Sequence, residues 1–178
     1  MKKSQNEFKV LLLGDTGVGK NTLISKYIKE VHLADLKLII GVDFYSIDQE
    51  VDGQQFKLKL WIMSRKERFR LLLSRYCKGA NGAFILYDIT NPSTLELIPE
   101  WTQILREQVG DIPIMLIGMK LDLKETRSVS KQKALEIVTS EGIDEYIECS
   151  TNTGQNIDKA FETLMRLMLH QSYTINYS

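Results

Sequence analysis

Short apolar runs alternate along this chain with segments in which apolar residues recur every three or four positions. The first pattern is typical of buried strands and the second of amphipathic helices. Strands are expected at residues 8–13, 43–51, 56–62, 82–88, 112–118 and 146–149, and helices at 21–30, 71–78, 95–105, 130–140 and 156–169. Asp52-Gly53 predicts a hairpin turn, whereas residues 31–40 have no clear period and are interpreted as a loop. Pro99 predicts a kink in its helix.

Strands that alternate with helices predict an α/β domain with a mainly parallel sheet covered on both faces. The expected sheet has six strands, one of them antiparallel because of the hairpin, and about five flanking helices. We expect one domain over residues 8–170, with a flexible N-terminus at 1–7 and a flexible tail at 171–178. In such sheets, ligands bind beyond the carboxyl ends of the strands.

The composition changes this picture little, because the 43% hydrophobic and 26% charged residues are those of an ordinary globular protein. Basic and acidic residues balance at 23 each, so no net field favours nucleic acid or an anionic membrane. The two cysteines, Cys77 and Cys149, lie in or beside apolar segments and fit buried thiols in a reducing compartment. The polar start lacks a signal-peptide pattern, and we expect a cytoplasmic monomer.

One stretch carries a recognisable chemistry, namely Gly-Asp-Thr-Gly-Val-Gly-Lys-Asn at positions 14–21. It follows an apolar strand and precedes a helical segment, and it fits a phosphate-binding loop except that Asn21 replaces a hydroxyl residue. Glycines let the backbone N–H groups surround a phosphate, while the helix N-terminus and Lys20 supply positive charge. The alternative is a glycine-rich turn that binds nothing.

Further motifs extend the pattern: Ile-Gly-Val-Asp-Phe (40–44), Glu-Arg-Phe-Arg (67–70), Gly-Ala-Asn-Gly-Ala (79–83), Tyr-Asp-Ile-Thr-Asn (87–91), Gly-Met-Lys-Leu-Asp-Leu (118–123) and Glu-Cys-Ser-Thr-Asn-Thr-Gly (148–154). Together with the phosphate loop, they make the chain resemble a small GTPase of the Ras superfamily, most closely its Rab-like branch. The resemblance implies a three-layer P-loop NTPase fold, the small G domain, that binds GDP or GTP. The phosphate-binding residues would be Asp15, Thr16, Gly17, Val18, Gly19, Lys20, Asn21 and Thr22.

The resemblance also implies which residues would recognise guanine. They are Lys120, Asp122, Leu123, Ser150, Thr151 and Asn152. The Asp122 carboxylate would accept the N1 and N2 hydrogens of guanine, where adenine presents a bare ring nitrogen. Met119 replaces the asparagine of the family pattern, and we expect this change to loosen the site without altering its preference. The alternative for Asp122 is a residue that only caps a turn.

The positions that would hold Mg²⁺ and support hydrolysis depart from the family. The implied metal positions are Asn21, Ile39 and Ile62, and only Asn21 retains an oxygen, as a weak ligand. Arg65 stands at the position of a glycine that binds the γ-phosphate, and Lys66 at that of the glutamine that positions the attacking water. We therefore expect weakened Mg²⁺ binding and slow or absent hydrolysis. Arg65 and Lys66 either replace the charge of the metal or form a solvated basic loop.

Phe44, Trp61 and Tyr76 match the aromatic surface that Rab-like proteins present to effectors, although all three could simply pack under the neighbouring loops. The chain ends without a cysteine motif for a prenyl group, so no membrane anchor is expected in this chain. Three functions remain open. They are a nucleotide-binding domain that acts through partners, a working GTPase with unusual or partner-supplied catalytic groups, and a nucleotide-free scaffold.

Overall fold

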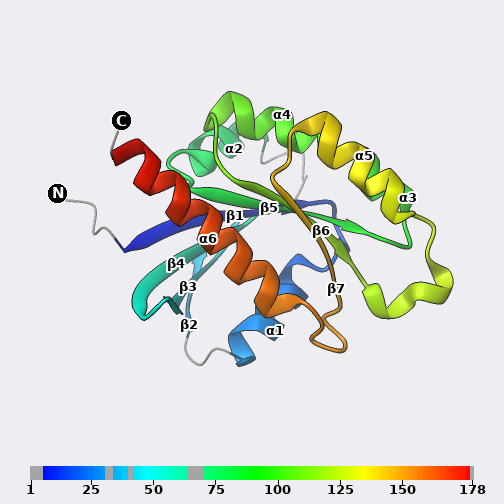
Figure 1. Ribbon diagram of the computed structural model, residues 1–178, viewed down its shortest axis with the longest axis horizontal. Coiled ribbons are helices and arrows are strands. Elements are labelled where there is room, and N and C mark those ends of the chain that lie inside the picture. Colours follow the sequence, from blue (N-terminus) through cyan, green and yellow to red (C-terminus); the bar gives the residue numbers. More distant parts are fainter. Residues whose placement is uncertain (1–5, 31–33, 40–41, 64–69, 177–178) are drawn as a thin grey trace.

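The computed structural model describes residues 6–30, 34–39, 42–63 and 70–176, and every structural statement below concerns these residues. Seven strands form one sheet in the order β2-β3-β4-β1-β5-β6-β7 (Figure 1). The strands are β1 (Glu7–Gly14), β2 (Ala34–Ile39), β3 (Val42–Val51), β4 (Gln54–Ile62), β5 (Gly82–Asp88), β6 (Ile114–Met119) and β7 (Glu145–Cys149). All pairs from β4 to β7 are parallel, whereas β3 is antiparallel to both of its neighbours. The α/β class, the mainly parallel sheet and its single antiparallel strand are thus confirmed.

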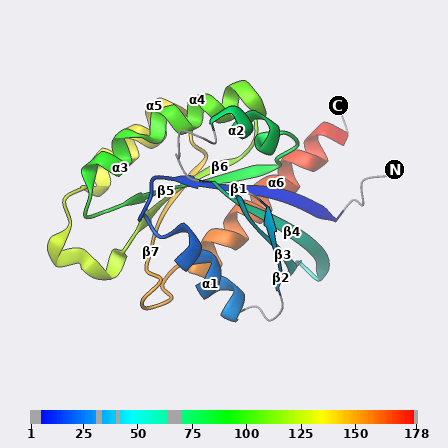
Figure 2. The ribbon, with the colours of Figure 1, turned by 180° about the vertical axis from the view of Figure 1, so that it is seen from behind.

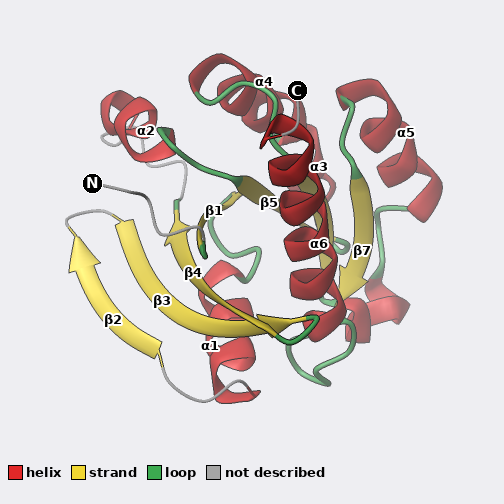
Figure 3. Cartoon of the chain, turned by 60° about the vertical axis from the view of Figure 1, so that its left-hand side comes forward, coloured by secondary structure: helices red, strands yellow, loops and turns green. Residues whose placement is uncertain are grey.

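The sheet has seven strands where the sequence predicts six, because the supposed loop at residues 31–40 contains β2. This strand pairs with β3 from Ala34 opposite Ile47 to Ile39 opposite Val42, and it lies at the edge of the sheet (Figure 3). Residues 34–38 (Ala-Asp-Leu-Lys-Leu) do alternate apolar and polar positions. The expectation of a loop was therefore wrong, because this short strand pattern is obscured by the apolar residues that flank it.

Helices cover both faces of the sheet (Figures 1 and 2). The described helices are α1 (Lys20–Glu30), α2 (Arg70–Cys77), α3 (Pro92–Glu96), α4 (Ile98–Gln108), α5 (Lys131–Glu141) and α6 (Ile157–Asn176), with a 3₁₀ helix η2 (Leu121–Thr126). Helices α1 and α6 lie on one face, and α2 to α5 lie on the other. None of the described helices is both long enough and apolar enough to span a bilayer.

The central strand β1 divides its side chains between two cores, as the period of two in a strand requires. Val10 and Leu12 pack in the core beneath α1 and α6, while Leu11 and Leu13 pack in the core beneath α2 to α5. All four are at most 1% exposed, so the apolar run at the start of the chain is buried on both faces, as predicted.

One helical segment agrees with the expectation from the sequence, and another extends beyond it. The segment around Pro99 is divided at Leu97 into α3 and α4, which confirms the predicted irregularity, and Pro99 lies in the first turn of α4. Helix α6 continues to Asn176, so residues 171–176 are helical rather than a flexible tail. The side chain of Gln171 donates to the Asp111 carbonyl at 2.7 Å, which ties this extension to the domain.

Candidate functional site

The loops that carry the sequence motifs lie together at one edge of the sheet. In the strand register, Gly14 at the end of β1 is paired with Leu86, and Met119 at the end of β6 is paired with both Asp88 and Cys149. The phosphate loop (residues 14–21), the base loop (residues 119–123) and the loop after β7 (residues 150–156) therefore begin side by side. This arrangement is expected for the carboxyl ends of parallel strands.

The phosphate loop has a backbone that only glycine can adopt at several positions. Gly14, Gly17 and Gly19 have φ angles of 146°, 84° and 106°. A Cβ atom at Gly14 would also lie 2.7 Å from the Leu86 carbonyl oxygen, which is too close for any side chain. Val18 is fully buried and anchors the loop to the core. Local sterics thus explain the glycine spacing before any ligand is considered.

Lys20 begins α1 and turns back over this loop. Its Nζ atom donates to the carbonyl oxygens of Gly14 and Asp15, each at 2.7 Å. Burial lowers the pKa of Lys20 to about 8, while the negative charge of Asp15 opposes that shift. The ammonium is therefore predominantly charged at pH 7 and is held beside the glycine-rich backbone, where an anion would meet it.

Met119 joins the phosphate loop to the base loop through an apolar contact. A Cβ atom added to Gly19 would lie 3.3 Å from the Met119 methyl carbon, so this methyl group packs directly beside Gly19. Met119 is 1% exposed and belongs to the core beneath α1 and α6. The hydrogen bonds that an asparagine could make here are replaced by van der Waals packing.

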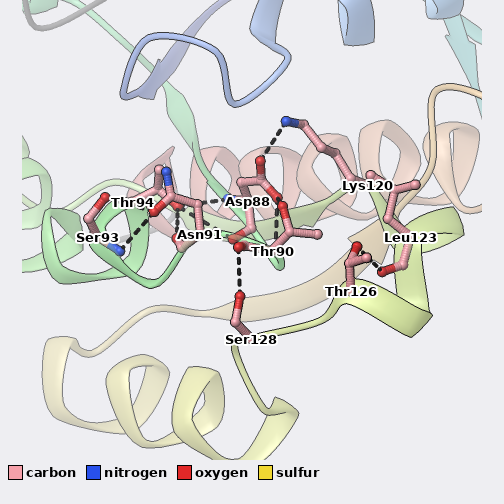
Figure 4. Close-up of polar contacts among 9 residues, drawn as sticks. All are labelled: Asp88, Thr90, Asn91, Ser93, Thr94, Lys120, Leu123, Thr126 and Ser128. Atoms are coloured by element: carbon pink, nitrogen blue, oxygen red, sulfur yellow. Dashed lines mark hydrogen bonds and ion pairs between the residues drawn. The ribbon is translucent and has the colours of Figure 1, made fainter.

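The base loop is shaped by an ion pair. Lys120 has the left-handed φ of 68°, and its Nζ atom lies 2.5 Å from Asp88 Oδ2 (Figure 4). Burial would raise the pKa of Asp88, but hydrogen bonds from Lys120 and Thr90 outweigh it and lower this pKa. Ser128 donates to the Thr90 carbonyl at 2.6 Å and ties the end of η2 to the same turn. Asp88 was not among the residues predicted for the site, although it stands at the end of a buried strand inside a quoted motif.

Asp122 lies at the start of η2 and faces the loop after β7. Its Oδ1 accepts a hydrogen bond from Ser150 Oγ at 2.6 Å, and its Oδ2 accepts one from Asn152 Nδ2 at 3.4 Å. These hydrogen bonds, that from Ser150 above all, lower the pKa of Asp122. The side chain is exposed and stays ionised at neutral pH. A carboxylate has room for about four hydrogen bonds, so about two positions remain for a ligand.

A buried ion pair supports this region from below. Arg127, just after η2, makes a bidentate contact with Glu148 of β7, with distances of 2.7 and 2.8 Å. Tyr146 donates to the same carboxylate at 2.6 Å. Burial would raise the pKa of Glu148, but these hydrogen bonds lower it. The Glu148 side chain is only 4% exposed, so its charge depends on these partners.

Of the implied metal positions whose side chains are described, Asn21 carries an oxygen atom and Ile62 does not. Asn21 Nδ2 donates to Asp43 Oδ2 at 3.2 Å, whereas Ile62 is 5% exposed and packs in the core. No group of three or more His, Cys, Asp and Glu residues suited to a metal occurs among the described residues. Carboxylate and amide oxygens are nevertheless ligands that Mg²⁺ accepts, and Mg²⁺ also takes phosphate oxygens and water. The donors Asn21 and Asp43 therefore fit the ion, but as a different set from the one that the resemblance implies.

The remaining predicted residues are placed as follows. Thr16 donates its N–H to Asp15 Oδ1 at 2.8 Å, Thr22 is exposed in the first turn of α1, Leu123 is 43% exposed in η2, and Thr151 is half-buried after β7. Arg65, Lys66 and the side chain of Ile39 lie outside the described residues, so the prediction that they matter for metal binding or hydrolysis stays a prediction.

The three predicted surface aromatics form one cluster. Phe44 and Trp61 are paired across β3 and β4 with ring centroids 5.1 Å apart, and the centroid of Tyr76 lies 5.8 Å from that of Trp61. Lys9 Nζ lies 4.4 Å from the centroid of the Trp61 ring. All three rings are half-buried, so they pack on one another and also leave part of their surface to solvent.

Comparison with known proteins gives the same assignment along nearly the whole domain. The Ras family model matches residues 9–170. The Ras-related protein RABA2a of Arabidopsis thaliana is 39% identical over 159 residues, which are 89% of this chain and 73% of that protein. The Ras-related protein Rab-8B of Bos taurus is 35% identical over 160 residues, or 89% and 77% of the two chains. This chain therefore belongs to the Ras family, and it is a Rab-like small GTPase of the Ras superfamily.

Proposed function

We propose that this protein binds GDP or GTP at the phosphate and base loops, hydrolyses GTP slowly or not at all, and acts through protein partners in signalling or trafficking. The observation that carries the proposal is the contrast within one site. The charged groups Lys20 and Asp122 lie in loops at the carboxyl edge of the sheet and suit a nucleotide, whereas Ile62 is buried at the position where the resemblance implies a metal-binding carboxylate.

Guanine selectivity follows from Asp122. The carboxylate is ionised and held by Ser150, and its remaining acceptor capacity suits two adjacent N–H donors such as N1–H and N2–H of guanine. Adenine would place a ring nitrogen lone pair against the same carboxylate, and this repulsion disfavours it. Lys120, fixed by Asp88, would lie along the base.

Slow hydrolysis follows from the groups that are missing. Mg²⁺, when bound to a nucleotide, neutralises charge on the phosphates and helps to orient them. With Ile62 in place of a carboxylate, phosphates and water would supply most of its ligands, so the ion would be held less tightly. The Lys66 ammonium has only N–H donors, so it cannot accept a hydrogen bond from the attacking water as the amide oxygen of a glutamine can.

Partner binding is supported by the cluster of Phe44, Trp61 and Tyr76. Half-buried aromatic rings that are rigidly packed on one another offer apolar area at a small cost in side-chain entropy. The cluster brings together side chains of β3, β4 and α2, so a single partner could contact three elements at once.

Two measurements test the proposal on freshly purified protein. The first identifies any nucleotide released on denaturation, and the second follows phosphate release from added GTP with Mg²⁺. Bound GDP or GTP without turnover supports the proposal. Turnover at a rate typical of the family would identify a working GTPase instead, and a protein that neither retains nor binds guanine nucleotide would identify a scaffold.

A further inference from the structure

A side-chain contact joins the end of the phosphate loop to the first residues of β3. Asn21 Nδ2 donates to Asp43 Oδ2 at 3.2 Å, although the two residues are 22 positions apart in the sequence. Asn21 is exposed in the first turn of α1, and Asp43 is half-buried. An amide and a carboxylate thus meet beside the loop that would hold the phosphates.

The strand register explains why the carboxylate reaches this place. Asp43 is directly opposite Ile62 in the antiparallel pair of β3 and β4. Residues directly opposite in such a pair have Cβ atoms about 4.5–5.5 Å apart and project from the same face of the sheet. The Cβ atoms of Asp43 and Ile62 are therefore expected to lie a few ångströms apart, on the face of the sheet that carries α1. Ile62 occupies the position at which the resemblance implies a carboxylate, so Asp43 brings a carboxylate close to that position.

The orientation of Asn21 leaves an oxygen donor beside Asp43. Because the amide nitrogen donates to the carboxylate, the amide oxygen is the atom of that group left for a cation. One oxygen of Asp43 accepts this hydrogen bond, and no described contact uses the other. The two side chains thereby offer two oxygen donors that one hydrogen bond holds in a fixed relation.

A nucleoside diphosphate at the phosphate loop would bring Mg²⁺ to this pair. Mg²⁺ keeps several water ligands and is usually bound through one or two carboxylates together with phosphate oxygens. We propose that Asp43 is the carboxylate that would hold the nucleotide-bound Mg²⁺, with the Asn21 carbonyl oxygen beside it as a second oxygen donor. This inference rests on the proposed function, since the nucleotide supplies the phosphate ligands.

The test measures metal affinity directly and not turnover. Mn²⁺ replaces Mg²⁺ in the GDP complex, and the free Mn²⁺ is followed by its electron paramagnetic resonance signal during a titration. The Asp43→Asn variant keeps the size of the side chain and can still pair with Asn21, but it loses the charge. Loss of a group that orients metal ligands typically lowers metal affinity by about 10–100-fold, and that loss is the expected result.

The control is Asp48→Asn, on the same strand, where an exposed carboxylate pairs with Lys57 at 2.7 Å and lies away from the loop. It should leave the Mn²⁺ affinity unchanged. GDP affinity in EDTA is measured in parallel, and Asp43→Asn should not weaken it. If Asp43→Asn behaves like Asp48→Asn, or weakens GDP equally with and without metal, the inference is overturned. If wild-type protein binds no GDP under either condition, the proposed function itself fails, and this inference fails with it.

Discussion

At the candidate site, neighbouring groups fix the orientation of each key side chain. Ser150 donates a hydrogen bond to Asp122, Asp88 pairs with the Lys120 ammonium, and two carbonyl oxygens of the phosphate loop accept hydrogen bonds from Lys20. Charge-assisted hydrogen bonds of this kind are stronger than neutral ones and also fix orientation. A single substitution that removes one of these contacts should therefore weaken ligand binding or lower stability.

Asp122→Asn should lower GDP affinity by about 100-fold or more. The amide can present at most one acceptor atom, so one N–H donor of guanine would face an N–H₂ group, and hydrogen bonds to a charged group contribute roughly 1.5–3 kcal/mol each. Calorimetric titration with GDP provides the measurement. Glu125→Gln, which removes an exposed carboxylate from the same 3₁₀ helix, is the control and should bind normally. Equal affinity of the two variants would exclude Asp122 as the base-recognition residue.

Met119→Ala should destabilise the fold by about 2–5 kcal/mol, because it leaves a cavity between the core and Gly19. Met119→Leu conserves volume and should cost less than about 1.5 kcal/mol. Urea denaturation of both variants measures these changes. A Met119→Ala variant as stable as wild type would mean that the contact with the phosphate loop contributes no packing energy.

At the scale of the elements, contacts at η2, α5 and β7 support the base loop. Arg127 and Glu148 connect the end of η2 to β7, and Ser130 caps α5 by accepting the N–H of Lys133. Breaking a buried ion pair leaves an uncompensated charge, which is far more costly than removing an exposed pair.

Arg127→Met should destabilise the protein by about 3–5 kcal/mol at neutral pH, with a smaller difference from wild type in acid. In wild type, the pKa of Glu148 is lowered, so its stabilisation is present above the unfolded pKa and is lost as the pH falls through the folded pKa. In the variant, burial acts with its largest counterweight removed, and only the hydrogen bond from Tyr146 and the ammonium of Lys131 at 3.8 Å remain, so protonation of Glu148 relieves part of the cost of its buried charge. Urea denaturation at pH 7 and pH 4 measures both differences.

The matched control is Arg166→Met, which removes an exposed arginine that pairs with Asp52 at 2.8 Å. Its effect on stability should be small at both pH values, because an exposed ion pair is screened by solvent and contributes little. A similar loss for both arginine variants at pH 7 would contradict the special role assigned to the buried pair.

Most of this element structure could be predicted from the sequence, because buried strands and amphipathic helices leave periodic patterns. The glycine spacing placed the phosphate loop, and Pro99 placed the break between α3 and α4. Strand β2 was missed although residues 34–38 alternate apolar and polar, because the pattern is short and the apolar pairs Leu33-Ala34 and Leu38-Ile39 on either side obscure it. The contacts of Asn21 with Asp43 and of Lys120 with Asp88 depend on strand register and on distances between strand ends, which single-sequence patterns do not encode.

For the whole molecule, the candidate nucleotide would connect loops that follow β1, β6 and β7 and thus bridge neighbouring parts of the sheet. A ligand that binds only the folded state stabilises it by an amount fixed by its concentration and affinity. At about 100 times its Kd, GDP should add about 2.7 kcal/mol and raise the melting temperature by roughly 5–10 °C. Thermal unfolding with GDP, ADP or no nucleotide tests this. An equal shift with ADP would contradict guanine selectivity.

The two tryptophans differ in their exposure to solvent, so tryptophan fluorescence can report on the surface cluster separately from the core. Trp101 is 2% exposed in the core beneath α2 to α5, whereas Trp61 is half-buried in the surface cluster beneath Lys9. Trp101 should emit at short wavelength and resist quenching by iodide, so any change in emission when a partner binds would come from Trp61. A Trp101→Phe variant would leave a single fluorophore at the very surface where partner binding is proposed.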